Sequence, residues 1–274
     1  MLCPQCDAIG SNRLHQFDSR SMPLGPSGQQ ATNLSCTMMS TITVESMEGE
    51  PVNRDGGGLS PEIAARVYDR IGRLQDTQSP FERPALDRLI AAGHFETATS
   101  VFELGPGTGS LAHRLLSDHL PPTCTYLGVD VSTRMVELAR RRIAAFADRA
   151  RVIHTDGTLP LPAADRSADR FIAAYVFDLL QHDYAARVID EVHRVLIPGG
   201  VACLTSLTNG QSALARLFSH GWHGIWRVAP RLVGGCRPID LRRLFDSDSW
   251  NVDEDVVIES WGVPCRLLVA TARP

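Results

Sequence analysis

The 274-residue chain contains no lysine, and all 27 of its basic residues are arginine. A P-loop lysine, a lysine Schiff base and the tyrosine–lysine pair of many dehydrogenases each need a lysine side chain. The absence of lysine therefore excludes these three kinds of site.

Long apolar runs and a strong charge excess are also missing. No stretch approaches the roughly 18 consecutive apolar residues of a membrane span, and the N-terminus lacks the basic and then apolar pattern of a secretory signal. The net charge is −4 at pH 7, which gives no general attraction to nucleic acid. The expectation is a cytoplasmic protein without a nucleic-acid partner.

The cysteines do not form the pattern of a disulfide framework. They are seven in number and scattered, which favours reduced thiols that behave as small apolar residues. Cys3 and Cys6 have the spacing of half a zinc site, which His15 and Cys36 could complete. Because no second paired cluster follows, the sequence favours no metal site.

The composition changes near residue 58. Residues 1–58 are rich in Ser, Gly, Pro and Gln, have no sustained apolar period, and end in a glycine-rich linker. Ser60 and Pro61 then have the pattern of a helix N-cap and first helical residue. We predict a disordered tail over 1–58 and one domain over 59–274 that begins with two helices, the second over 81–92.

From Ser100 onward, short apolar segments alternate with amphipathic ones. This order predicts a doubly wound α/β fold with a mostly parallel seven-stranded sheet, whose last two strands form an antiparallel pair at one edge. The expected strands are 100–104, 125–129, 151–154, 170–176, 201–207, 255–259 and 266–270, and the expected helices between them are 110–119, 133–147 and 184–196.

A glycine-rich turn follows the first predicted strand. The segment Gly105-Pro106-Gly107-Thr108-Gly109 joins that strand to a helix, and glycine lets the backbone bend sharply and approach a ligand closely. The pattern also approximates the dinucleotide fingerprint. An NAD(P)-dependent oxidoreductase is therefore one alternative at this point.

Three acidic residues fall at the ends of the first three predicted strands. A carboxylate at Glu103 disfavours a pyrophosphate and favours an ammonium or sulfonium group. Asp130 is placed to accept hydrogen bonds from two ribose hydroxyls, and Asp156 suits the exocyclic amine of adenine. Asp130 could instead cap the next helix, and Asp156 could be a turn residue.

The ordered set of motifs resembles the class I S-adenosylmethionine-dependent methyltransferases, in the branch of the ubiquinone/menaquinone C-methyltransferases. The resemblance covers about residues 60–274. Its motifs are Gly105–Gly109, Gly128–Met135, Asp156–Pro160, Asp169–Phe171 and Glu191–Gly200. It implies S-adenosyl-L-methionine as cofactor and in-line methyl transfer to a small-molecule acceptor.

The resemblance also implies ten cofactor-binding residues. At the methionine end these are Glu103, Gly105, Gly107 and Gly109; at the ribose, Asp130; at the adenine, Val131, Met135, Asp156 and Gly157; and beside the sulfonium, Tyr175.

The acceptor is less well specified, because in-line transfer needs mainly alignment and exclusion of water. Asp178 stands where relatives often carry a histidine and is a candidate catalytic base, or else a helix cap or turn residue. Tyr68 matches a tyrosine of the lid helix in relatives and is a candidate substrate-binding residue, or else a core residue.

Residues 211–231 combine leucines, tryptophans and arginines. Such a segment can cover an active site or lie on a membrane surface. We favour the lid, because Gly221 and Gly224 are expected to interrupt the helix. The membrane alternative would point to a lipid or prenyl-quinone acceptor.

Two other functions stay open at this stage. The NAD(P)-dependent oxidoreductase is disfavoured by Glu103 and by the missing lysine. A non-catalytic S-adenosylmethionine-binding module would keep the same glycine turn and acidic residues. The sequence carries no signal of the oligomeric state.

Overall fold

The computed structural model describes residues 58–71, 79–228 and 235–274. Apart from Gly58, the predicted tail lies outside these residues, and so do Cys3, Cys6, His15 and Cys36. The disordered tail therefore stays a prediction, and the zinc alternative, which the sequence disfavours, is not tested.

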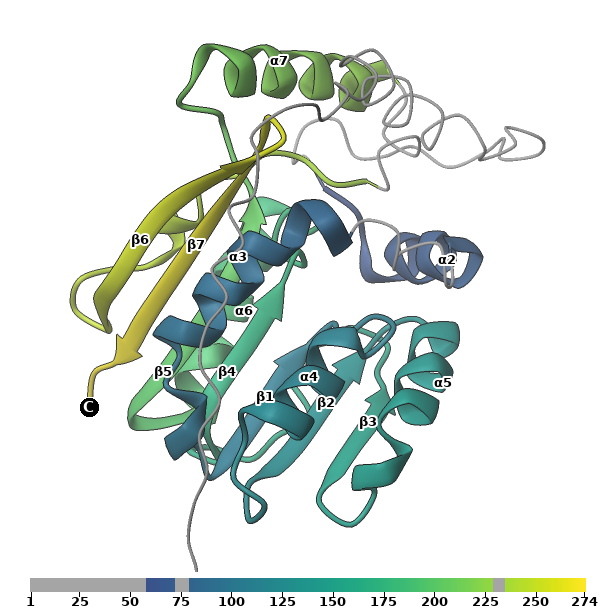
Figure 1. The fold of residues 1–274 in the computed structure, drawn as a ribbon, viewed down its shortest axis with the longest axis vertical. Helices are drawn as coiled ribbons and strands as arrows, with labels where there is room; N and C mark the ends of the chain where they lie inside the picture. The colour runs from purple at the N-terminus through teal and green to yellow at the C-terminus, as the bar shows by residue number, and fades with distance from the viewer. Residues whose placement is uncertain (1–57, 72–78, 229–234) are drawn as a thin grey trace, which may run out of the picture. The chain divides into compact units, whose positions relative to one another are not determined.

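A seven-stranded sheet forms the centre of the domain, in the order β3-β2-β1-β4-β5-β7-β6 (Figure 1). The first five strands are parallel, and β7 lies antiparallel between β5 and β6, which confirms the predicted fold class. The strands are β1 Ser100–Leu104, β2 Thr125–Asp130, β3 Ala150–His154, β4 Ala168–Ala174, β5 Leu196–Leu207, β6 Trp250–Ser260 and β7 Val263–Ala272.

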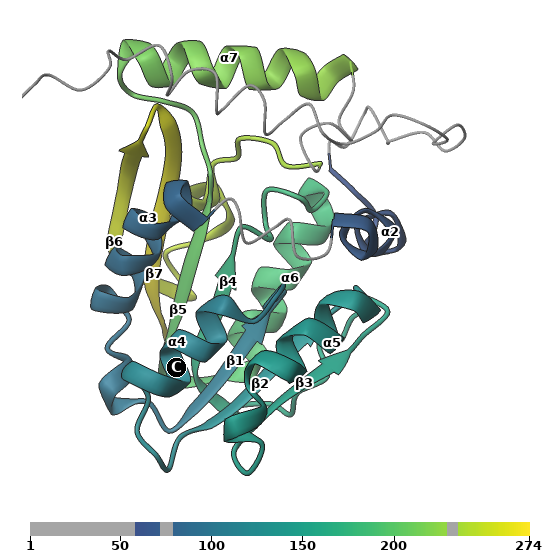
Figure 2. The same cartoon turned by 45° about the vertical axis from the view of Figure 1, so that its right-hand side comes forward.

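Helices cover both faces of this sheet (Figures 1 and 2). The helices α3, α4 and α5 pack on one face and α6 on the other, while α2 lies beyond the carboxyl ends of the strands. Their bounds are α2 Pro61–Ile71, α3 Ser79–Ala92, α4 Ser110–Asp118, α5 Thr133–Arg142, α6 His182–Val195 and α7 Ala213–Val228.

The core has two layers because the central strands are buried on both faces. In β4, Phe171 packs toward α6, whereas the next residue, Ile172, packs toward α3 and α4. In β5, Leu204 packs toward α6 and Cys203 toward α3 and α4. All four of these side chains are 0% exposed. Two-sided burial explains why these strands read as continuous apolar runs.

Several element boundaries differ from the sequence-based expectations. The helix predicted over 133–147 ends at Arg142 and is followed by a 3-10 turn, Ala144–Phe146. The strand predicted to reach residue 176 ends at Ala174, because Tyr175 has a positive φ of 56° and turns the chain. That turn lies beside the proposed sulfonium position.

The expectation that Gly221 and Gly224 interrupt the 211–231 helix is wrong. The helix α7 runs unbroken from Ala213 to Val228. Each glycine costs about 1 kcal/mol relative to alanine in a helix, but two tryptophans anchor the helix around them. Trp222 Nε1 donates to Cys236 O at 2.8 Å, and Trp226 Nε1 donates to Gly235 O at 3.1 Å.

No helix of the described residues combines the length and the apolar content needed to cross a membrane.

Candidate functional site

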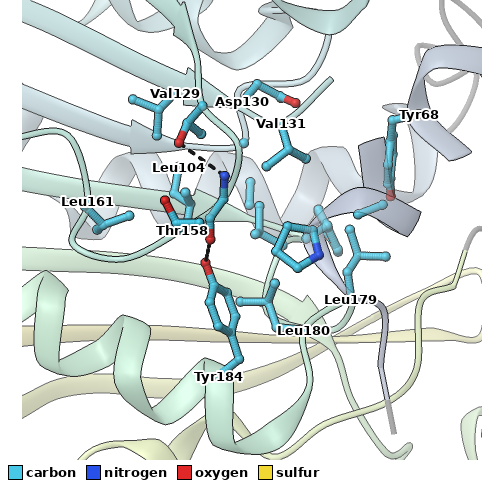
Figure 3. Close-up of a pocket in the computed structure, with 18 residues that line it drawn as sticks. Tyr68, Leu104, Val129, Asp130, Val131, Thr158, Leu161, Leu179, Leu180 and Tyr184 are labelled. Atoms are coloured by element: carbon cyan, nitrogen blue, oxygen red, sulfur yellow. Dashed lines mark hydrogen bonds between the residues drawn. The ribbon is translucent and has the colours of Figure 1, made fainter. Parts of the chain in front are cut away.

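A pocket opens where the strand order reverses between β1 and β4, the usual ligand position in open α/β sheets (Figure 3). Its cavity volume is about 90 Å³, and it is partly open to solvent. Its lining includes Leu104, Val129, Asp130, Val131 and Tyr175 at the strand ends, Pro61, Ala64 and Tyr68 of α2, and Tyr184 of α6.

Of the glycine turn, Gly105 lines this pocket, whereas Gly107 and Gly109 do not. Gly105, Gly107 and Gly109 have φ values of 67°, 54° and 77°, which glycine adopts without strain. A Cβ at Gly105 would lie 2.6 Å from Val176 Cγ2, and one at Gly109 would lie 2.8 Å from Ala139 Cα. Gly109 therefore lets α4 approach α5 closely, in agreement with a packing role for this glycine.

Glu103 precedes the turn, is only 1% exposed and does not line the pocket itself, although the next two residues, Leu104 and Gly105, do. Its Oε2 accepts a hydrogen bond from Tyr126 Oη at 2.6 Å. The β1–β2 register pairs Glu103 with Gly128, and a Cβ at Gly128 would lie 3.0 Å from Tyr126 Oη. The missing side chain at Gly128 thus leaves room for the tyrosine to reach the carboxylate.

Burial raises the pKa of Glu103 from 4.5 to about 7, although the Tyr126 hydrogen bond lowers it and nearby Asp130 raises it further. A cationic ligand group beside this carboxylate would favour its charged form. The Tyr126 partner was not predicted, but its position two residues before Gly128 on β2 is a signal that could have indicated it.

Asp130 joins the glycine turn to the start of α5. Its Oδ2 accepts from Gly107 N at 3.1 Å and its Oδ1 from Ser132 N at 2.9 Å. Burial raises its pKa from 3.8 to about 6 against these two hydrogen bonds. Each carboxylate oxygen has a second lone pair, so this pocket-lining residue can still accept from ribose hydroxyls.

The structure places Asp156 in an exposed turn. Its Oδ1 accepts from Thr158 N at 2.9 Å and from Thr158 Oγ1 at 2.7 Å, and these bonds hold its pKa below the usual range. Asp156 is not among the pocket-lining residues, whereas Gly157 and Thr158 are. This geometry matches the turn-residue alternative, so contact between Asp156 and adenine stays a prediction.

The two residues expected against the adenine ring are placed differently. Val131 lines the pocket. Met135 is 0% exposed within α5 and does not line the pocket, so any support that it gives to the ring would be indirect.

Tyr175 lies at the carboxyl end of β4 and lines the pocket as expected. Its backbone N donates to Thr205 O at 2.9 Å, and its Oη donates to Cys265 Sγ at 3.2 Å. A non-glycine residue with a φ of 56° is strained, and such strain is concentrated at ligand-binding and catalytic positions.

Asp178 is fully buried three residues beyond Tyr175. Its Oδ2 accepts from Leu207 N at 3.4 Å, while its Oδ1 has no hydrogen-bond partner. Burial raises its pKa from 3.8 to about 7, and the Arg237 charge lowers it slightly. Asp178 does not line the pocket itself, although its neighbour Leu179 does.

Other buried polar atoms without a partner lie near Asp178 along the chain or across the sheet. Within the described residues these are Thr205 Oγ1, Ser206 Oγ and Arg237 Nε. The backbone N of Arg237 donates to Asp178 O at 3.0 Å, which brings these segments together. The carboxyl ends of β4 and β5 therefore carry unused hydrogen-bonding capacity.

The helix α2 forms part of the pocket wall. Asp69 Oδ1 accepts from Ser132 Oγ at 2.6 Å and from Arg134 N at 3.1 Å, which ties α2 to the start of α5. At the other end, Leu59 N donates to Leu179 O at 2.6 Å. Tyr68 lines the pocket, and its Oη lies 3.9 Å from Cys236 Sγ.

Tyr184 is a lining residue that no sequence motif indicated. It projects from the start of α6, and its hydroxyl donates to Gly157 O (Figure 3). Among the described residues, no three His, Cys, Asp or Glu side chains converge as metal ligands would.

Comparison with known proteins agrees with this geometry. Residues 101–200 match the family model of the methyltransferase domain. A malonyl-[acyl-carrier protein] O-methyltransferase of Marinomonas sp. (strain MWYL1) is 30% identical over 61% of this chain and 62% of its own length. A tRNA N(3)-methylcytidine methyltransferase, Mettl2, of Drosophila melanogaster is 31% identical over 44% of this chain and 38% of its own.

Among solved structures, the N-methyltransferase NodS of Bradyrhizobium japonicum WM9 with bound S-adenosyl-L-homocysteine superposes with a TM-score of 0.58. The match covers 78% of this chain and 98% of the NodS chain. Because the two sequences are only 16% identical, it shows a shared fold alone. Residues 101–200 thus match a methyltransferase domain, and S-adenosylmethionine is the cofactor that this match supports. The chain spans about three fifths of the length of the first relative.

Proposed function

We propose that the protein transfers a methyl group from S-adenosylmethionine to a small-molecule acceptor. The observation that carries the proposal is that the buried carboxylate of Asp130, bonded to Gly107 N, lines the pocket beside Gly105, while the buried carboxylate of Glu103 lies two residues before Gly105. The cofactor supplies an activated methyl group on a sulfonium, so the protein mainly has to bind, orient and exclude water.

Each end of the pocket has chemistry suited to a different part of the cofactor. Glu103 would bind the amino group of the methionine end, and Asp130 the ribose hydroxyls. Val131, Gly157 and Thr158 would enclose the adenine. A buried carboxylate just before the turn favours a cationic ligand over the pyrophosphate of NAD(P), which supports a methyltransferase against the oxidoreductase alternative.

The acceptor side of the pocket is largely apolar. Ala64 and Tyr68 of α2 line the pocket together with Leu179 and Leu180. This space suits a compact organic acceptor better than a folded macromolecule, and the charge of −4 offers no general attraction to RNA. These features support a small-molecule acceptor.

Asp178 is the proposed proton acceptor when the acceptor must lose a proton. Its pKa of about 7 leaves it partly ionised near neutral pH, which suits a general base. Its Oδ1 has no hydrogen-bond partner, although Asp178 is fully buried and only its neighbour Leu179 lines the pocket. Replacement of Asp178 with asparagine should lower kcat by roughly 10²–10⁴-fold while leaving cofactor affinity nearly unchanged.

The acceptor class is tested with methyl-labelled S-adenosylmethionine and a fractionated cell extract. The expected result is label in the small-molecule fraction and none in RNA or protein. Label in either macromolecular fraction would contradict the proposed acceptor class. Cofactor binding without transfer to any fraction would instead favour a non-catalytic binding module.

A further inference from the structure

The helix α7 has three distinct faces, and one of them is buried against the other described residues. Ala215 and Ser219 are buried, and Trp222 and Trp226 bond to the 235–236 backbone on the same side. A second set of side chains, spaced at i, i+3, i+11 and i+14, is exposed: Leu214 65%, Leu217 72%, Ile225 42% and Val228 87%. This spacing places them in one stripe along the helix.

The third face is basic. Arg216, His220 and His223 follow at i, i+4 and i+7, all exposed, and the helix contains no acidic residue. At 100° per residue, the basic stripe lies between the packed face and the apolar stripe. An apolar face beside an arginine, in a helix without a carboxylate of its own, is complementary to an anionic lipid surface. The Glu259 carboxylate of β6 interacts with Arg216 near the start of the helix.

The tip of the β6–β7 hairpin extends the apolar stripe. Trp261 at this tip is 75% exposed, and a Cβ at Gly262 would lie 3.4 Å from Leu214 Cγ, so the tip abuts the start of α7. Figures 1 and 2 both show the hairpin tip beneath the end of the helix where α7 begins. Trp261 also has a φ of 55°, a strained conformation for a large side chain with no core to fill.

The hairpin and the helix are fixed to one another. Glu259 Oε1 accepts from Gln211 N at 2.6 Å and from Ser212 N at 3.1 Å, which anchors the start of α7 to β6. Five of the six large apolar side chains that are exposed in the described residues belong to this surface. Such concentration of apolar groups marks an interaction site rather than chance exposure.

We propose that α7 and Trp261 form a docking surface for an anionic membrane. Leu214, Leu217, Ile225 and Val228 would enter the interface between headgroups and acyl chains, with Trp261 at its edge. Arg216 and the two histidines would lie at the level of the anionic headgroups. The proposal rests on this surface and does not depend on methyl transfer.

Vesicle co-sedimentation of the full chain tests the proposal. Vesicles of phosphatidylcholine with phosphatidylglycerol should bind the protein, and vesicles of phosphatidylcholine alone should bind it much less, with binding reduced by salt. The double variant L217Q/V228Q should lower the partition coefficient roughly tenfold. Ile197→Gln is the matched control: Ile197 is 38% exposed near the start of β5, away from α7.

A second variant separates docking from folding. Replacement of Trp261 with glycine should leave the melting temperature unchanged or raise it, because glycine adopts a φ of 55° without strain. The same change should lower vesicle binding. Equal binding by wild type and both variants, or no binding to anionic vesicles, overturns the proposal.

Sedimentation velocity without vesicles tests whether a second copy of the chain binds this surface instead of a membrane. The expected result is the same oligomeric state for wild type and L217Q/V228Q. An oligomer that dissociates in the double variant would instead make this face a contact between copies of the chain and would contradict membrane docking.

Discussion

Glu103 combines near-complete burial with a raised pKa, and this combination links pH to stability. An acid whose pKa is higher in the folded protein than in the unfolded chain stabilises the fold at low pH, and that contribution is lost as the pH rises. For Glu103 the loss occurs between pH 4.5 and about 7. The shift corresponds to a cost on the order of 3 kcal/mol for ionised Glu103 in the unliganded protein.

The variant E103Q should therefore be more stable than the wild type at pH 8 and differ less from it at pH 5. Urea unfolding at both pH values measures this. E96Q is the control, because Glu96 is a glutamate whose side chain is 68% exposed. A Glu103 variant that loses stability equally at both pH values would contradict the assigned burial cost.

Gly109 allows a steric prediction with an internal reference. Gly109 and Gly199 have φ values of 77° and 80°, so alanine is strained to a similar degree at both. A Cβ at Gly109 meets Ala139 Cα at 2.8 Å, whereas one at Gly199 meets nothing within 4 Å. Gly109→Ala should cost about 1–3 kcal/mol more than Gly199→Ala in the free energy of unfolding.

Chemical denaturation of the two glycine variants gives that difference directly. Equal losses would show that backbone strain alone matters at Gly109 and that α4 and α5 tolerate the added methyl group.

At the residue scale, the sequence predicted groups that follow strand ends and missed groups that act through distant contacts. Gly105 and Asp130 lie at the pocket, as the strand–turn–helix pattern indicates. Asp69 touches Ser132 across 63 positions, and Tyr184 touches Gly157 across 27. No local pattern marks such pairs, because they exist only once the helices have packed.

At the element scale, α2 is held at the pocket wall by the Asp69 contacts described above. Replacement of Asp69 with alanine removes both hydrogen bonds to the start of α5, and each bond to a charged acceptor contributes about 1 kcal/mol or more. We expect α2 then to close over the pocket less often, so the dissociation constant for S-adenosylhomocysteine should rise roughly fivefold to thirtyfold.

Thermal-shift titration with S-adenosylhomocysteine measures this loss. Asp118→Ala is the control, because Asp118 is exposed at the end of α4. Equal affinities for the two variants would mean that α2 does not act as a lid.

Element types were largely predictable and element ends were not. The alternation of short apolar strands and amphipathic helices gave all seven strands, since two-sided burial leaves a clear pattern. The end of β4 depends on the left-handed turn at Tyr175, and the continuity of α7 depends on tryptophan contacts with Cys236 and Gly235. Both are tertiary effects that local propensity does not contain.

At the scale of the whole molecule, the sheet order brings together residues that are distant in the chain. The reversal between β1 and β4 creates the pocket, and α2 and α6 form part of its wall. The cofactor side was predictable because its motifs are local to strand ends. The acceptor side was less so, because its walls come from α2, α6 and the segment after β4, whose contacts arise only from the packed fold.

The central claim is that a cationic nucleoside cofactor binds with its amino group against Glu103. Calorimetric titration with S-adenosylhomocysteine at pH 6, 7 and 8 tests it most directly, in the wild type and in E103Q. Wild-type affinity should weaken roughly tenfold per pH unit below about 7, because binding needs the ionised carboxylate, and E103Q should bind weakly with little dependence on pH. No binding by the wild type, or equal affinity and pH dependence in the two proteins, would contradict the account.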